Sequence, residues 1–217
     1  MRTKALLLTA ALSAAGVATS MAQAVYSVNA VGYVNTVVKP GFNLISNPLT
    51  ATDNSIANLF KGVPVDTAVY KYIPGTGFAI AQYDGDVLAF LPASAAALTV
   101  VPGEGVFIKN PTATDFTITF VGEVSQGSLS HATPKGLSIQ SSEVPQSGTA
   151  ADLGLVGAAD DTVYQYDTTT HGYKISSFDG DTLAWAPALG TLKVGEAFFL
   201  KKAAAGTWTR TFSVNTQ

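Results

Sequence analysis

One pattern occurs twice in this chain, and it restricts the fold to a tandem repeat. Residues 67–90 and 161–185 each carry a Val-Tyr-x-Tyr stretch, an apolar alternation and then Asp-Gly-Asp, at a separation of 94 to 95 positions. The Asp-Gly pairs, Asp84-Gly85 and Asp179-Gly180, predict the turn of a β-hairpin, because this dipeptide accepts the positive φ of a tight turn. A period of this length predicts one small domain per repeat.

The rest of each repeat consists of short β-branched and aromatic runs separated by turn residues. We count about seven such runs per repeat, and no long helical period lies between them. A single helical turn is expected at residues 55–60. The sequence therefore predicts an all-β protein of two related sandwich-like or barrel-like repeats, residues 25–122 and 123–217.

The N-terminus has the three parts of an export signal. Arg2 and Lys4 precede an apolar run at residues 5–17, and Ala22-Gln23-Ala24 supplies small residues for cleavage. The apolar run is too short to remain as a membrane anchor. We therefore expect residues 1–24 to be a signal peptide, and the remaining chain to be secreted, at the cell surface or in the periplasm, without membrane insertion.

The charge of the chain limits the classes of partner, and its cysteine content limits how the fold can be stabilised. Cleavage would remove two of the 12 basic residues and none of the 15 acidic ones, which leaves a net charge of −5. An acidic chain without basic clusters is not typical of a nucleic-acid binder, nor of a protein that docks on anionic lipid. The chain has no cysteine, so each repeat must be held by its core without disulfides. No motif predicts a cofactor.

The Asp-Gly-Asp turns are the sharpest polar feature and could offer ligands to calcium. The four carboxylates are Asp84, Asp86, Asp179 and Asp181. Ca²⁺ needs six to eight oxygen ligands, and two carboxylates per turn are too few. The favoured interpretation is a turn aspartate followed by a solvated one.

Aromatic residues of the repeated segment could instead stack on sugar rings. Eight rings qualify: Tyr70, Tyr72, Tyr83, Phe90, Tyr164, Tyr166, Phe178 and Trp185. The pairs that flank the turns are the best candidates for ligand binding, namely Tyr83 with Phe90 and Phe178 with Trp185. For any single ring, packing in the core of a β domain is the favoured alternative.

The sequence offers little for catalysis. Glu104 and Glu196 occupy equivalent places, each after a glycine, and suit a turn better than a shared catalytic cleft. His131 and His171 have no neighbours at ligand or triad spacing, and no known nucleophile or phosphate-loop motif occurs. We therefore expect a protein that is not an enzyme.

Three stretches resemble known sequences. Residues 41–49, GFNLISNPL, and residues 102–107, PGEGVF, resemble a secreted bacterial module with a G-W-N-L-I-S-x-P strand and a later P-G-x-G-Y-W strand. The start at residues 26–35 is similar to uncharacterised exported β-repeat proteins of Verrucomicrobia-like bacteria. Phe42 stands where that module has Trp, and repeat two keeps only residues 136–139 of its first motif. The resemblance implies an extracellular β-module and no particular chemistry.

Together these features predict an exported, non-enzymatic β-module with a structural, cell-surface or extracellular-matrix role. The alternative is a carbohydrate-binding module. Possible partners are cell-surface glycans or further copies of the chain through terminal strands, because residues 212–215 repeat the pattern of residues 26–29. We expect the N-terminal strand at residues 26–34 to pair within its own chain, and the two repeats to pack as one unit.

Overall fold

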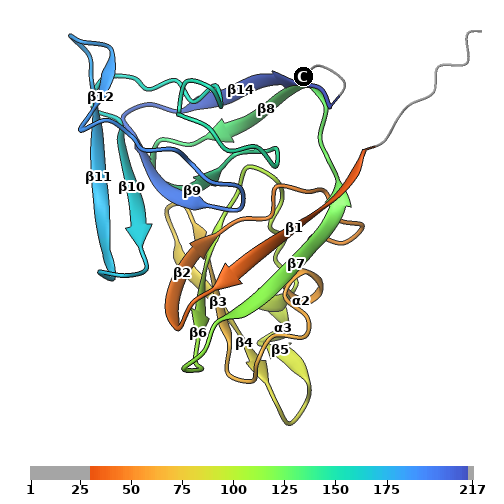
Figure 1. The fold of residues 1–217 in the computed structure, drawn as a ribbon. Helices are drawn as coiled ribbons and strands as arrows, with labels where there is room; N and C mark the ends of the chain where they lie inside the picture. Colours follow the sequence, from red (N-terminus) through yellow and green to blue (C-terminus); the bar gives the residue numbers. More distant parts are fainter. Residues whose placement is uncertain (1–29, 215–217) are drawn as a thin grey trace, which may run out of the picture.

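Seven strands follow the same order in each repeat of the computed structural model, which describes residues 30–214 (Figure 1). Repeat one contains β1 (Val31–Val38), β2 (Gly41–Ile45), α2 (Ile56–Leu59), β3 (Ala68–Ile73), β4 (Gly77–Asp84), β5 (Ala89–Leu91), α3 (Ala93–Ala96), β6 (Val106–Asn110) and β7 (Phe116–Glu123). Repeat two contains β8 (Gly127–Thr133), β9 (Gly136–Ser141), β10 (Thr162–Asp167), β11 (Gly172–Asp179), β12 (Ala184–Ala186), β13 (Ala197–Lys202) and β14 (Gly206–Phe212). The predicted all-β tandem repeat is confirmed, whereas the predicted signal peptide lies outside the described residues.

Each repeat folds into a five-stranded antiparallel sheet and a separate two-stranded ribbon. The sheet orders are β2-β6-β3-β4-β5 and β9-β13-β10-β11-β12, and the ribbons are β1-β7 and β8-β14. The first and last strands of each repeat therefore pair with each other, which closes the repeat within one chain.

Strand β1 runs without interruption through Gly32 and pairs antiparallel with β7 from Val31↔Glu123 to Val38↔Phe116. In Figure 1 the two strands cross the front of repeat one side by side. The expected pairing of the N-terminal strand within its own chain is confirmed for the part that begins at Val31. Residues 26–29 lie outside the described range.

Each repeat has its own hydrophobic core between the sheet and the ribbon. In repeat one, the inward residues of the ribbon pack with those of the sheet, and Phe120 meets Phe60 edge to face at 5.9 Å between ring centroids. In repeat two, Trp208 packs on Phe198 at 6.1 Å, and its indole Nε1 donates a hydrogen bond to the Leu153 carbonyl. Period-two alternation in the ribbon strands directs every second side chain into these cores.

Two four-residue helices accompany the sheet of repeat one. Ser55 begins α2, because its hydroxyl accepts a hydrogen bond from the Asn58 N–H. This helix confirms the predicted helical turn, whereas α3 was not expected. No helix among residues 30–214 is long and apolar enough to cross a membrane.

The predicted tight turn at Asp84-Gly85 is wrong in its geometry. Strand β4 ends at Asp84 and pairs there with Ala89, so the loop contains four residues, and the positive φ, 51°, falls on Leu88. Gly85 is needed for a different reason: a Cβ there would lie 2.8 Å from the Val65 side chain. Repeat two has the same loop, with a φ of 52° at Leu183.

Candidate functional site

The first aspartate of each Asp-Gly-Asp sequence stabilises its turn. The Asp84 Oδ1 accepts hydrogen bonds from the backbone N–H groups of Asp86 and Val87, at 2.8 and 3.1 Å. Asp179 accepts the same pair in repeat two, from Asp181 and Thr182, and these bonds hold the pKa of the Asp179 carboxyl below its usual range. Residues 30–214 contain no group of three His, Cys, Asp or Glu side chains arranged to hold a metal ion.

The predicted ring pairs form, but they face the cores. Tyr83 and Phe90 lie 5.3 Å apart, and Phe178 and Trp185 also lie 5.3 Å apart, both pairs edge to face. Phe90 is only 4% exposed, and the other three rings are partly buried. A side chain at Gly157 would collide with the Phe178 ring. With one ring buried and three partly buried, these pairs do not offer the open faces that sugar stacking needs.

Glu104 and Glu196 stabilise turns and reach one strand of their own sheet, as the turn interpretation predicts. The Glu104 carboxylate accepts the Val101 N–H at 3.1 Å and contacts the Lys71 ammonium at 2.9 Å. Glu196 makes the equivalent turn bond, to the Lys193 N–H at 3.0 Å, and its Oε1 accepts from the side chain of Gln165 at 3.1 Å.

Repeat two holds a half-buried charged group that sequence spacing did not reveal. The His131 Nδ1 lies 3.3 Å from a Glu143 carboxylate oxygen, and the imidazole packs 5.2 Å from the Trp208 ring. Arg210 donates to the Gln146 amide at 2.6 Å. Burial lowers the pKa of Arg210, and the negative charge of Glu143 opposes that effect. These residues come from two strands and a loop, so only the folded chain brings them together.

A continuous aromatic cluster joins the two five-stranded sheets. It consists of nine rings, which we call the aromatic surface: Phe42, Tyr70, Tyr72, Phe78, Phe107, Tyr164, Tyr166, Tyr173 and Phe199. Phe107 and Phe199 meet at its centre, 5.7 Å apart. Each also contacts a tyrosine of the opposite repeat, Tyr166 at 5.2 Å and Tyr72 at 5.9 Å. The contact is therefore nearly twofold symmetric.

The rim of the aromatic surface reaches solvent. Phe78 and Tyr173, which are equivalent residues of β4 and β11, are each 46% exposed. Burial raises the pKa of Tyr166 and Tyr173, so their hydroxyls stay protonated and can donate hydrogen bonds. The alternation in β4 was visible in the sequence and places Phe78 and Tyr83 on opposite faces of the strand. It does not predict which of the two faces packs in the core.

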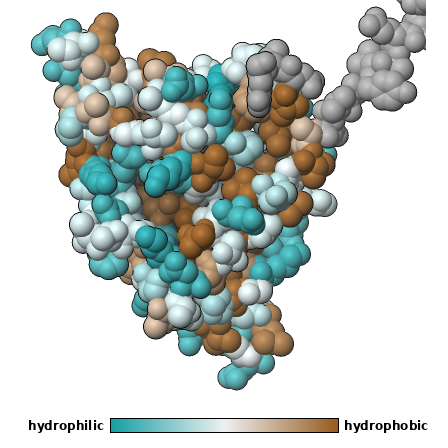
Figure 2. All heavy atoms as spheres, viewed as in Figure 1, coloured by the Kyte–Doolittle hydropathy of each residue, from teal (hydrophilic) through white to brown (hydrophobic). Residues whose placement is uncertain are grey.

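The ribbon of repeat one exposes apolar side chains on its outward face. Its exposed apolar residues, which we call the outer ribbon face, are Val31, Tyr33, Val37 and Val121, at 53 to 72% exposure. In Figure 2, apolar side chains interrupt the polar surface along this ribbon. By strand register, the equivalent positions of repeat two for the last three are Ser128, Ala132 and Thr211. The ribbon fold therefore does not require apolar residues on this side.

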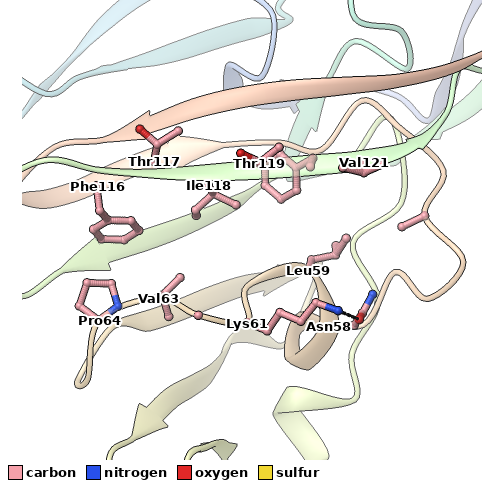
Figure 3. A pocket seen from close by; sticks show the side chains of 13 residues that line it. Asn58, Leu59, Lys61, Val63, Pro64, Phe116, Thr117, Ile118, Thr119 and Val121 are labelled. Atoms are coloured by element: carbon pink, nitrogen blue, oxygen red, sulfur yellow. Dashed lines mark hydrogen bonds between the residues drawn. The ribbon is translucent and has the colours of Figure 1, made fainter.

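Beside the ribbon lies a groove of about 580 Å³ between β7 and the chain that follows α2. Figure 3 shows Phe116 and Ile118 of β7 directed towards Leu59, Val63 and Pro64 across it. One wall of the groove is thus the edge of a β-strand, and the other is largely apolar.

No protein-family model, no curated protein and no solved structure matches this chain. The function must therefore be argued from the surfaces described above.

Proposed function

We propose that this chain is an exported, non-enzymatic β-module with a structural role at the cell surface or in the extracellular matrix. The outer ribbon face carries the proposal. Clustered exposed apolar side chains on a folded protein mark an interaction site, and Tyr33 lies directly opposite Val121 on this face. Strand propensity alone would favour Val and Tyr in both ribbons, yet repeat two keeps the same strands with Ser128, Ala132 and Thr211 at these positions.

The test exchanges residues between the repeats. The triple variant Tyr33→Ser, Val37→Ala and Val121→Thr gives repeat one the side chains that repeat two carries at the equivalent positions. We expect it to remain folded and to move from the cell-surface fraction into the medium. The matched control, Thr117→Ser with Thr119→Ser on the same strand, should stay with the cells. Equal retention of the triple variant and the parent would refute the proposal.

A carbohydrate-binding function is the second candidate, and the aromatic surface supports it. Phe78 and Tyr173 expose nearly half of their area at equivalent places, with tyrosine hydroxyls nearby as hydrogen-bond donors. Pull-down on insoluble polysaccharides tests it. Retention should fall in Phe78→Ala with Tyr173→Ala and persist in Trp185→Ala, whose ring packs against the core. If the parent is not retained on any polysaccharide, this candidate is excluded.

A further inference from the structure

The edge of β7 can accept another strand, and we propose that residues 25–29 of a second copy of this chain occupy it. This extends the proposed function from attachment to self-assembly, and it uses the backbone edge and groove instead of the outer ribbon face. Attachment can therefore persist where assembly fails, and the two outcomes are separable.

The direction of the backbone groups identifies the open edge. The Val124 N–H donates to the Ala30 carbonyl at 2.7 Å, on the side of β7 that faces β1. Backbone groups alternate in direction along a strand, so those of Thr117, Thr119 and Val121 point to the other side. Within residues 30–214, no backbone group pairs with these three on that side. An open row of N–H and C=O groups is a template for strand addition.

The groove beside this edge leaves space for an added strand. At its far end Thr50 exchanges two backbone hydrogen bonds with Glu123, both 2.9 Å long, and the chain then turns away into α2. In repeat two the corresponding chain stays against β14. There a Cβ at Gly154 would lie 2.8 Å from the Thr209 carbonyl oxygen. The groove of about 580 Å³ described above lies in repeat one, beside the ribbon that carries the outer ribbon face.

The sequence of residues 25–29, VYSVN, matches the groove. In an extended strand Tyr26 and Val28 project to one side, and Val25, Ser27 and Asn29 project to the other. Tyr26 and Val28 can enter the apolar groove while the others continue the exposed side of β7. Residues 26–29 also repeat the pattern of residues 212–215, which begins with the last residue of β14. The segment therefore has a sequence that this fold already uses at a strand end.

The whole segment cannot pair in its own groove. It joins β1 at Ala30, and the open position lies beyond β7, two strand spacings or about 10 Å from β1. About three residues would be used to span that distance, which leaves only about two to pair. The Thr50–Glu123 pair also occupies the end of the edge that lies nearest to Ala30. A second copy has no such restriction, and repetition of this head-to-tail contact would build a filament or a ring.

Sedimentation velocity across a concentration series tests the proposal, with the chain that begins at Val25 as the parent. We expect the parent to associate and a chain that begins at Ala30, which lacks the donor segment, to remain monomeric. Thr119→Pro should also be monomeric, because it removes one outward N–H from the edge, where proline is tolerated. The same change on the corresponding strand of repeat two, Thr211→Pro, is the control and should associate like the parent.

A pair of substitutions in the donor segment and a mixing experiment test whether association uses this segment and this edge. Val28→Asp should abolish association, because it places a charge in the apolar groove, whereas Ser27→Asp on the opposite side should not. A mixture of the Thr119→Pro chain and the chain that begins at Ala30 should form dimers and nothing larger, because it holds one donor and one acceptor. A monomeric parent at every concentration, or equal association without residues 25–29, would overturn the proposal. Retention of the parent on cells then tests the structural function separately.

Discussion

Ile45 forms an antiparallel bridge with Glu196 across the boundary between the repeats. Their equivalents with exchanged roles, Gln140 and Glu104, form the same bridge on the other side. Position 45 thus contacts position 196, and their counterparts in the other repeat, positions 140 and 104, contact each other in the same way. This reciprocity is the rule of a twofold interface between identical subunits. Here the interface joins two halves of one chain.

The symmetric contact predicts that the two repeats unfold together. The backbone N–H of Ser46 donates to the Gly195 carbonyl, and that of Ser141 donates to Gly103, both at 2.9 Å. Together with the buried part of the aromatic surface, these bonds connect the repeats as one unit. We expect a single calorimetric transition with equal calorimetric and van 't Hoff enthalpies. Two resolved transitions would show independent repeats.

Gly105 gives a second, residue-level prediction at the same interface. A Cβ at this position would lie 2.3 Å from the Cβ of Ala197, its own counterpart, and 2.7 Å from Ile139. Gly105→Ala should therefore overpack the contact and lower the free energy of unfolding by about 1–3 kcal/mol. Urea denaturation measures the effect. Gly190→Ala is the control, because a Cβ there meets open space, and a comparable loss in both variants would contradict the interface explanation.

Acid should weaken the protein through turn aspartates of repeat two. Backbone hydrogen bonds, from Thr149, Thr169 and Thr182 respectively, lower the pKa of Asp152, Asp167 and Asp179 below 3.8. The folded state therefore favours the ionised carboxylates. Their contribution is fully present above the unfolded pKa, near 4, and is lost as the pH falls through the lower folded values.

The measurement is the melting temperature from neutral pH down to about pH 2, a range that includes the unfolded pKa near 4. Replacing the three aspartates with asparagine keeps an oxygen acceptor in each turn and removes the titration. We expect the triple variant to lose less stability on acidification than the parent. Parallel curves for the two proteins would show that these turns do not set the acid response.

The sequence predicted the strands better than it predicted what their faces contact. Period-two alternation located β3 and β4 and separated Phe78 from Tyr83. It could not tell which side was the core, because both sides of each sheet are apolar: one packs in its own repeat and the other contributes to the aromatic surface. Tyr83 was therefore placed among the best candidates for ligand binding, although it packs against the core.

Contacts between distant strands could not be predicted from the sequence either. The pairing of β1 with β7 and the chain path past α2 leave a groove that no local sequence pattern predicts. The outer ribbon face could have been suspected by aligning Tyr33 with Ser128 and Val37 with Ala132. Only the strand register shows that Tyr33 and Val121 lie opposite each other.

Export is a prediction from the N-terminal sequence. We expect the native protein to begin at Val25 after cleavage behind Ala24, and to occur outside the cytoplasm. Intact-mass measurement of the protein recovered from fractionated native cells tests both points. An uncleaved chain in the cytoplasmic fraction would contradict the predicted signal peptide and would also remove the basis for a cell-surface role.

A buried ion pair distinguishes repeat two from repeat one. The Lys202 ammonium contacts the fully buried carboxylate of Asp161, which also accepts the N–H groups of Ala158 and Ala203. The corresponding residues of repeat one are Thr67 and Asn110, both buried. The same place in the fold thus accommodates a charged pair or a neutral one.

Breaking the pair and replacing it should therefore have different consequences. Lys202→Asn alone leaves the Asp161 carboxylate buried without a counter-charge, and we expect it to lower the free energy of unfolding by about 3–5 kcal/mol. Adding Asp161→Thr removes the orphaned charge and gives repeat two the neutral residues of repeat one. The double variant should recover most of the loss, because the Asn110 amide already bonds two carbonyls, those of Val38 and Thr114, in that position. A double-mutant cycle in urea measures the coupling, and additive losses would mean that the two side chains act independently.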